Sequence, residues 1–163
     1  MSKATIQTAA VSASQPSTSG VLMGRYEHAL DPKKRFTVPS EWRTAMGNPD
    51  YVYIMPDPAV PCLNLIPKAE MEARLEKLRE KALFDPALNQ ALQTIGANAE
   101  QLPLDTQGRI RVSDRFLNFA NLTSSVVLVG AVRMIKLWNP AALTPEGKVD
   151  QAALGAALEK VAF

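Results

Sequence analysis

Residues 30–38 read LDPKKRFTV and residues 104–112 read LDTQGRIRV, so one short stretch occurs twice with its Leu, Asp, Arg and Val in the same places. Further along, the aromatic residue Trp42 corresponds to the aromatic residue Phe116. Internal similarity at a fixed spacing indicates one supersecondary unit that is used twice. The match continues in two later pairs of segments: 51–54 with 125–128, and 65–67 with 138–140.

Each copy begins with a strand pattern. Residues 26–30 and 35–38 flank a short turn that is rich in Asp, Pro, Lys or Gly, which is a hairpin signal. Pro39 suits the first position of a helix, and Ser113 and Asp114 are good helix caps. We therefore expect a β-β-α-β-β unit, used twice, in an α+β chain. The remaining expected elements are helices 40–46 and 114–121 and strands 51–55, 62–66, 125–130 and 134–138.

Three longer helices are expected outside these units. Residues 67–83 carry Met71, Leu75, Leu78 and Ala82 at helical spacing, with charged residues on the opposite face. Asp85 and Pro86 start a second helix, and a last one begins near Asp150. Their apolar faces allow two interpretations: packing on the core of the same chain, or contact between subunits.

Composition limits the class of protein. The 163 residues carry a net charge of only +2, so nucleic-acid binding must come from the local placement of cations. The longest apolar run, residues 126–132, is too short to cross a membrane. One Cys and one His exclude an intrachain disulfide and a zinc site built from these residue types within one chain. A cytoplasmic protein fits best.

Residues 1–20 have one Lys, no acidic residue and no aromatic residue. We expect a disordered tail, because such a segment buries too little apolar surface to offset its ordering entropy. A secretory signal is the alternative, but the only weakly apolar patch, residues 9–11, is too short for its apolar region.

An enzyme is the main rival class. Cys62 and His28 are the only candidates for a thiol nucleophile with a histidine base, and each is better explained as a residue of a strand. No phosphate-binding loop, carboxylate pair or metal-spaced cluster stands out. We therefore expect no enzymatic activity, no cofactor, no metal and no small-molecule substrate.

The repeat resembles the MraZ family of the AbrB/SpoVT superfamily. The resemblance covers about residues 20–139 and rests on residues 24–31 with Arg35, Pro39 and Arg43, on residues 104–110 and 127–130, and on Trp138. It implies a swapped-hairpin, AbrB-like β-barrel with pseudo-twofold symmetry and peripheral helices. The segments expected on this basis are a tail 1–20, a first repeat 21–67, linking helices 68–97, a second repeat 98–140 and a C-terminal connection with a helix 141–163.

The resemblance also implies a function. It points to a bacterial, nucleoid-associated transcription regulator that binds direct repeats upstream of its own division and cell-wall gene cluster, and that assembles into a ring of subunits. Double-stranded DNA and further copies of the chain are then its partners. Two Asp-x-x-x-Arg motifs carry this implication, with Asp31 and Asp105 as positioning residues. The expected DNA-contacting residues are Lys33, Lys34, Arg35, Arg109, Arg25 and Arg43.

The chemistry of an Arg at a turn agrees with that role. A guanidinium presents a rigid fork of donors that can pair with O6 and N7 of guanine, while an Asp four positions earlier can fix its direction. The first turn, with Lys33 and Lys34 beside Arg35, is expected to face DNA more directly than the second. The alternative for both motifs is an ion pair that only stabilises the turn.

The first motif departs from the family pattern because Lys34 stands where the second copy has Gly108. If that position requires a positive φ, Lys costs about 1 kcal/mol relative to Gly. A further alternative for the whole chain is an antitoxin-like interaction or assembly module with little DNA specificity of its own. Salt dependence separates these functions, because phosphate contacts weaken steeply with salt.

Overall fold

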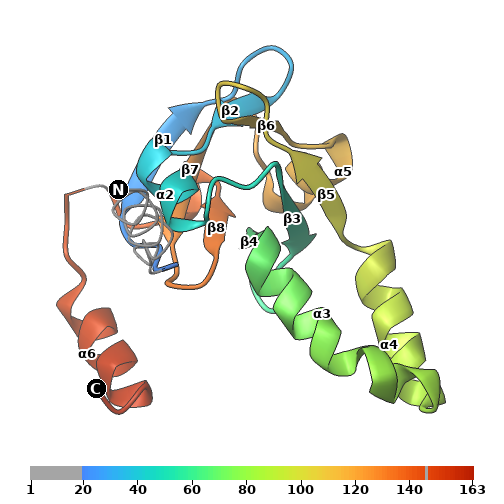
Figure 1. Ribbon diagram of the computed structural model, residues 1–163. Helices are drawn as coiled ribbons and strands as arrows, with labels where there is room; N and C mark the ends of the chain where they lie inside the picture. Colours follow the sequence, from blue (N-terminus) through green and yellow to red (C-terminus); the bar gives the residue numbers. More distant parts are fainter. Residues whose placement is uncertain (1–19, 146) are drawn as a thin grey trace, which may run out of the picture.

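A computed structural model describes residues 20–145 and 147–163. The expected tail therefore lies almost wholly outside the described residues. The chain is α+β, and its strands form one antiparallel six-stranded sheet and a separate two-stranded ribbon (Figure 1). The strands are β1 (Arg25–Ala29), β2 (Arg35–Thr37), β3 (Tyr51–Pro56), β4 (Leu63–Pro67), β5 (Glu100–Pro103), β6 (Arg109–Arg111), β7 (Ser125–Gly130) and β8 (Ile135–Trp138).

Strands of both copies are mixed in the large sheet. Its order is β1-β7-β8-β4-β3-β5. Strand β1 of the first copy pairs with β7 of the second, and β5 of the second copy pairs with β3 of the first. Each copy also contributes a regular hairpin, β3–β4 or β7–β8, and these two hairpins meet where β4 pairs with β8. The order therefore reads the same from either end when each strand is replaced by its repeat counterpart.

Two expectations about the strands are wrong. The stretches 26–30 and 35–38 do not pair with each other, because β1 pairs along its whole length with β7 and β2 pairs with β6. The expected closed barrel is also absent from the described chain, since β1 and β5 end the large sheet and the β2–β6 ribbon is not hydrogen-bonded into it. The physical reason for the first difference is that β1 and β2 each take an antiparallel partner from the other copy, and such pairing depends on tertiary packing rather than on the local turn signal.

A single apolar core lies between the sheet, the ribbon and two short helices, α2 (Ser40–Ala45) and α5 (Asp114–Ala120). Trp42 and Phe116, which correspond in the repeat, are both buried, as the sequence predicts. The indole N–H of Trp42 donates to the Met23 carbonyl over 2.9 Å, and Tyr26 meets the indole edge to face. The helices thus anchor each copy to the shared core.

The longer helices project from this core. They are α3 (Lys68–Leu83), α4 (Pro86–Ala97) and α6 (Gln151–Lys160), and a 3-10 turn η1 (Pro140–Ala142) precedes α6. The expected cap of α4 is confirmed, because the Asp85 side chain accepts a hydrogen bond from the Leu88 amide. Of the apolar stripe expected along α3, Met71 and Ala82 are buried, whereas Leu75 is 37% exposed. No described helix is long and apolar enough to cross a membrane.

Candidate functional site

The turn between β1 and β2 is built around the carboxylate of Asp31. Its Oδ1 accepts hydrogen bonds from the backbone amides of Lys33 and Arg35, over 2.9 and 2.8 Å. Its Oδ2 accepts one from Nε of Arg35 over 2.7 Å. The backbone closes the same turn, since Asp31 and Arg35 are joined by an N–H to carbonyl hydrogen bond of 3.0 Å. The Asp therefore fixes both the turn and the direction of the Arg.

The turn between β5 and β6 repeats this arrangement. Asp105 accepts from the amides of Gln107 and Arg109, both over 2.9 Å, and from Nε of Arg109 over 2.7 Å. Exposure is also similar, because the Arg35 and Arg109 side chains are 27% and 31% exposed. The two Asp-x-x-x-Arg motifs are thus equivalent in geometry, and they differ in the cations beside them.

The hydrogen bonds stabilise the ionised form of both carboxyls. At Asp31, partial burial on its own raises the pKa, but the amide and guanidinium of Arg35 outweigh it, so the pKa lies below its usual value. At Asp105 the Arg109 amide is the largest cause, and the pKa is lowered to about 2. Both carboxyls therefore stay ionised across the physiological pH range.

Each Arg keeps part of its guanidinium for other acceptors. Only Nε contacts the Asp, and within the described residues neither Nη of Arg35 or Arg109 donates a hydrogen bond. An Arg that uses both Nη groups can bind two acceptors in one plane, such as the edge of a guanine or two phosphate oxygens. The motif therefore leaves a directed, partly exposed donor at each turn.

The two turns are held side by side. The Val38 amide donates to the Gly108 carbonyl over 2.9 Å, and the Val112 amide donates to the Lys34 carbonyl over 3.1 Å. Between these contacts β2 and β6 pair antiparallel, which sets Arg35 opposite Arg111. Arg111 is exposed and was not among the predicted site residues, because its place beside Arg35 depends on the pairing between copies.

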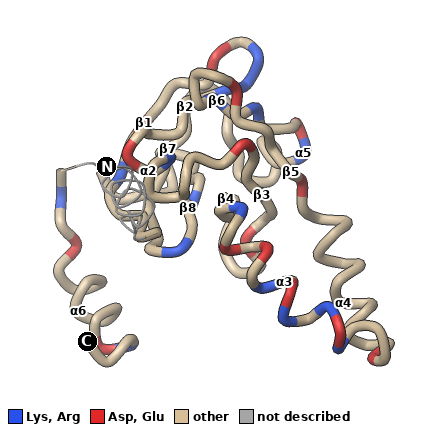
Figure 2. The backbone as a smooth tube through the Cα atoms, viewed as in Figure 1, with Lys and Arg blue, Asp and Glu red and all other residues tan. Residues whose placement is uncertain are grey.

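The two turns form one charged end of the molecule. The loop between β1 and β2 lies at an extremity, where Figure 2 shows basic and acidic residues together. Lys33, Lys34 and Arg35 come from the first turn, whereas the second offers Arg109 with neutral Gln107 and Gly108. The turn cations therefore come mainly from the first copy, and Arg111 of β6 adds a further cation from the second.

Lys34 adopts a left-handed backbone conformation with a φ of 62°, close to the φ of 78° at Gly108. This position therefore has a positive φ in both copies, which is the case in which Lys is less favourable than Gly. A side chain with a Cβ is strained there by roughly 1–2 kcal/mol. The Lys34 ammonium reaches toward the Thr123 carbonyl, at 3.4 Å.

Arg43 lies against the second turn. A Cβ added at Gly108 would be 2.5 Å from Cζ and Nε of Arg43, so the guanidinium packs directly on the glycine. Its Nε donates to the Val38 carbonyl over 3.0 Å. Arg43 thus bridges β2 and the second turn, and this contact explains why a glycine suits residue 108.

Arg25 is the predicted site residue that the structure does not bring to the turns. It starts β1, six residues before Asp31, which corresponds to roughly 20 Å along a strand. Its Nη1 donates to the Thr144 carbonyl over 2.7 Å. Arg25 therefore ties the C-terminal connection to β1.

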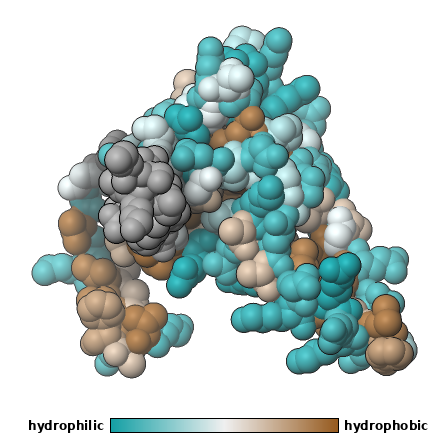
Figure 3. All heavy atoms as spheres, in the orientation of Figure 1, coloured by the Kyte–Doolittle hydropathy of each residue, from teal (hydrophilic) through white to brown (hydrophobic). Residues whose placement is uncertain are grey.

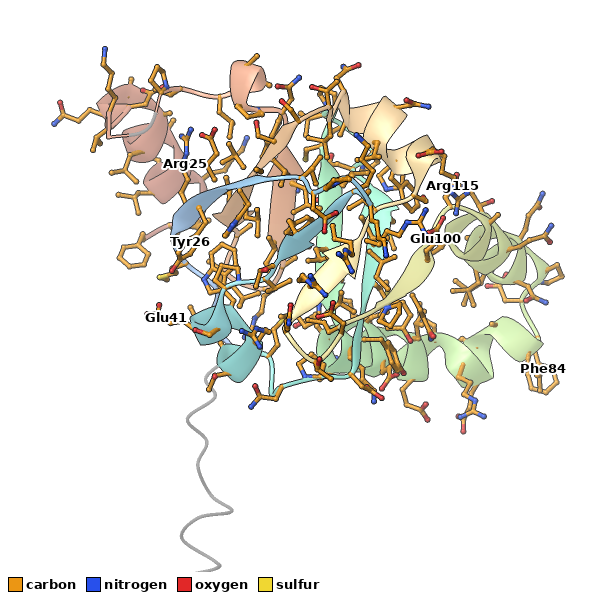
Figure 4. The ribbon with its side chains drawn as sticks, turned by 90° about the horizontal axis from the view of Figure 1, so that it is seen from above. Arg25, Tyr26, Glu41, Phe84, Glu100 and Arg115 are labelled. Atoms are coloured by element: carbon orange, nitrogen blue, oxygen red, sulfur yellow. The ribbon has the colours of Figure 1, made fainter. Side chains whose placement is uncertain are left out.

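Two polar clusters were missed at the sequence level. Lys136 donates to Asp57 and Asn64 over 2.7 and 2.8 Å, which joins the two copies at the β4–β8 pair. On the opposite side, Arg115 donates to Glu100 over 2.9 Å, and Figure 4 shows these two side chains facing each other. Lys136 lies 79 and 72 residues from Asp57 and Asn64, and Arg115 lies 15 residues from Glu100, so local spacing gave no signal for either contact.

The thiol and imidazole considered for catalysis are not neighbours. His28 lies in β1, whereas Cys62 directly precedes β4, and strands β7 and β8 lie between them. Three strand spacings amount to about 14 Å. Cys62 is also fully buried, and burial raises the pKa of its thiol. These two residues therefore do not form a nucleophile and its base.

Comparison with known proteins gives a consistent set of relatives. A family model for MraZ protein, described as antitoxin-like, matches residues 95–143. The chain is 32% identical over 119 residues to the transcriptional regulator MraZ of Corynebacterium jeikeium, covering 73% of this chain and 81% of that protein. It is 27% identical over 119 residues to the regulator of the same name from Clostridium acetobutylicum, covering 73% of this chain and 82% of that protein. A third, from Corynebacterium glutamicum, is 28% identical over 141 residues, covering 86% and 96% of the two chains.

Proposed function

The chain belongs to the MraZ family, and from that premise we propose that it is a sequence-specific DNA-binding transcriptional regulator. The observation that carries the proposal is the pair of adjacent turns in which an Asp directs an Arg and leaves its Nη groups free among the described residues. Relatives named transcriptional regulators support the same class of function.

The β2–β6 ribbon is the element that we propose enters the DNA groove. A two-stranded antiparallel ribbon fits the major groove of B-DNA, where an Arg can read guanine through O6 and N7. Arg35 and Arg109 are the base-reading candidates, because Asp31 and Asp105 orient their guanidinium groups. Contacts to bases specify the sequence in this arrangement.

Contacts to phosphate supply the remaining affinity. Lys33 and Lys34 directly precede Arg35 in the first turn, where an ammonium can reach the DNA backbone. Arg43 is a positioning residue in this account, since its Nε is used within the chain and it packs on Gly108. Arg25 lies too far along β1 to join the same contact.

A single subunit offers few cations, so we infer that several copies act together on direct repeats upstream of the division and cell-wall gene cluster. Linked sites raise the overall affinity through effective concentration, even where each contact is weak. A homo-oligomer of this kind, at the nucleoid in the cytoplasm, agrees with the turns lying at one end of each subunit (Figure 1).

DNase footprinting on the DNA upstream of the gene for this protein tests the proposal. We expect protection of short segments that recur at a fixed spacing, and loss of that protection for Arg35→Ala. Arg74→Ala is the matched control, because Arg74 is an exposed Arg on α3, away from the turns and outside the α3–α4 groove. Uniform protection without repeated segments would instead favour an interaction module with little DNA specificity.

A further inference from the structure

Helix α6 has an apolar face that the described part of its own chain leaves exposed. None of its residues is buried, and Leu154 and Leu158 are 51% and 40% exposed. Val161, one turn further, is 67% exposed. Helices shorter than about 12–15 residues are marginal in water without tertiary packing, and α6 has ten residues. This face therefore needs a partner surface.

A groove between α3 and α4 is the complementary feature. It encloses about 640 Å³, and its apolar wall is formed by Leu75, Ala82, Leu83 and Leu92. At the end of this helical hairpin Phe84 is 85% exposed. Figure 3 shows apolar surface gathered at the tip of the hairpin and on α6. Grooves between helices commonly bind the apolar face of another helix.

The two surfaces are separated within one subunit. In Figure 1, α6 and the α3–α4 hairpin lie on opposite sides of the β core, and both extend away from the end that carries the turns. We propose that α6 of one copy docks in the α3–α4 groove of a second copy. This inference rests on the self-association in the proposed function and names the surfaces that mediate it.

The size of the two surfaces supports a specific contact. Their exposed apolar side chains together amount to on the order of 1,000 Å², which is near the lower bound for a specific protein–protein interface. Charged residues border both surfaces, so Glu159 at the side of the apolar face of α6 can pair with Arg79 at the groove. The contact is therefore apolar at its centre and polar at its rim.

The contact is heterologous, because it joins two different surfaces. Each subunit has one helix α6 and one groove, so every copy binds two neighbours, and repetition gives a closed ring or an open chain. The turn residues take no part in it. The Asp–Arg turns of all copies consequently remain available on the opposite end of the subunits.

Two charge-introducing variants test the contact without DNA. Leu158→Lys disrupts the helix surface, and Leu75→Lys disrupts the groove. Ala156→Lys is the control, since it adds the same charge on the opposite face of α6, where the residue is also exposed. Masses are measured by native mass spectrometry and sedimentation, and circular dichroism checks that each variant is folded.

We expect wild type and Ala156→Lys to form assemblies of three or more copies, and each Leu variant to fall to the single-chain mass of 17.7 kDa. An equimolar mixture of the two Leu variants has one intact helix facing one intact groove, so it should give a heterodimer and nothing larger. A monomeric wild type overturns the proposal. So does a Leu75→Lys variant that keeps the wild-type mass, which would indicate contact between two α6 helices. Because no DNA is present, these outcomes are independent of whether the chain binds DNA.

Discussion

Replacing Lys34 by Gly tests the turn and its charge in one variant. Lys34 has a φ of 62°, where a residue with a Cβ is strained by roughly 1–2 kcal/mol. Gly removes this strain but makes the unfolded chain more flexible, which costs about 0.4–1 kcal/mol. The hydrogen bond that Lys34 makes to Thr123 is long and exposed, so its loss matters little. We expect Lys34→Gly to raise the free energy of unfolding by about 0.5–1 kcal/mol.

The same substitution should weaken DNA binding. If Lys34 contacts a phosphate, its loss lowers the slope of log affinity against log salt by about 0.9. Stability and affinity then change in opposite directions, which indicates that the charge is kept at the expense of an unstrained turn. Urea unfolding and fluorescence-anisotropy titrations at several salt concentrations measure the two quantities.

Lys33→Gly is the matched control, because Lys33 is exposed and does not have a positive φ. It should lose affinity as Lys34→Gly does, but its stability should fall by about 0.4–1 kcal/mol. A Lys34→Gly protein that is less stable than wild type would refute the strain argument. An unchanged salt slope would refute the phosphate contact.

Three other perturbations give distinct outcomes. Gly108→Ala should lower the free energy of unfolding by about 2–3 kcal/mol in urea, because it adds backbone strain and displaces Arg43. When Arg43→Ala is already present, only the backbone strain of roughly 1–2 kcal/mol should remain. Trp42→Ala should cost about 3–5 kcal/mol, since the indole is buried, and an unchanged urea midpoint would contradict this. The Asp105 carboxyl should titrate near pH 2 by NMR. Because its pKa is depressed, its contribution to stability is present above about pH 4 and is lost as the pH falls toward 2; Arg109→Ala should restore the pKa only in part, since the backbone amide of residue 109 remains.

Local patterns predicted much of the fold. The repeat, the capped helix after Asp85 and the buried pair Trp42 and Phe116 all follow from composition and spacing over a few residues. The pairing partner of the first strand in each copy could not be predicted from these local patterns. Strand β1 has a hairpin-like turn after it, yet it pairs with β7, about a hundred residues further along the chain. Such pairing depends on tertiary packing, which periodicity does not report.

In the candidate site, too, local contacts could be predicted from the sequence and contacts between the two copies could not. The Asp31–Arg35 and Asp105–Arg109 contacts were expected from their spacing, because four residues across a tight turn bring these side chains together. Arg111 beside Arg35, and Arg43 on Gly108, were not foreseen as contacts, since both require the strands of one copy to lie against the other. Whether the turn residues contact DNA stays a prediction.

DNA recognition by the turns is tested most directly by a fluorescence-anisotropy titration with the DNA upstream of the gene, against scrambled DNA of equal length. Wild type, Arg35→Ala and the control Arg74→Ala are compared at several salt concentrations. We predict tight, salt-sensitive binding that prefers the upstream sequence, is lost in Arg35→Ala and is kept in Arg74→Ala. Equal binding to both DNAs at every salt concentration, or full binding by Arg35→Ala, would contradict the proposal that these turns read DNA.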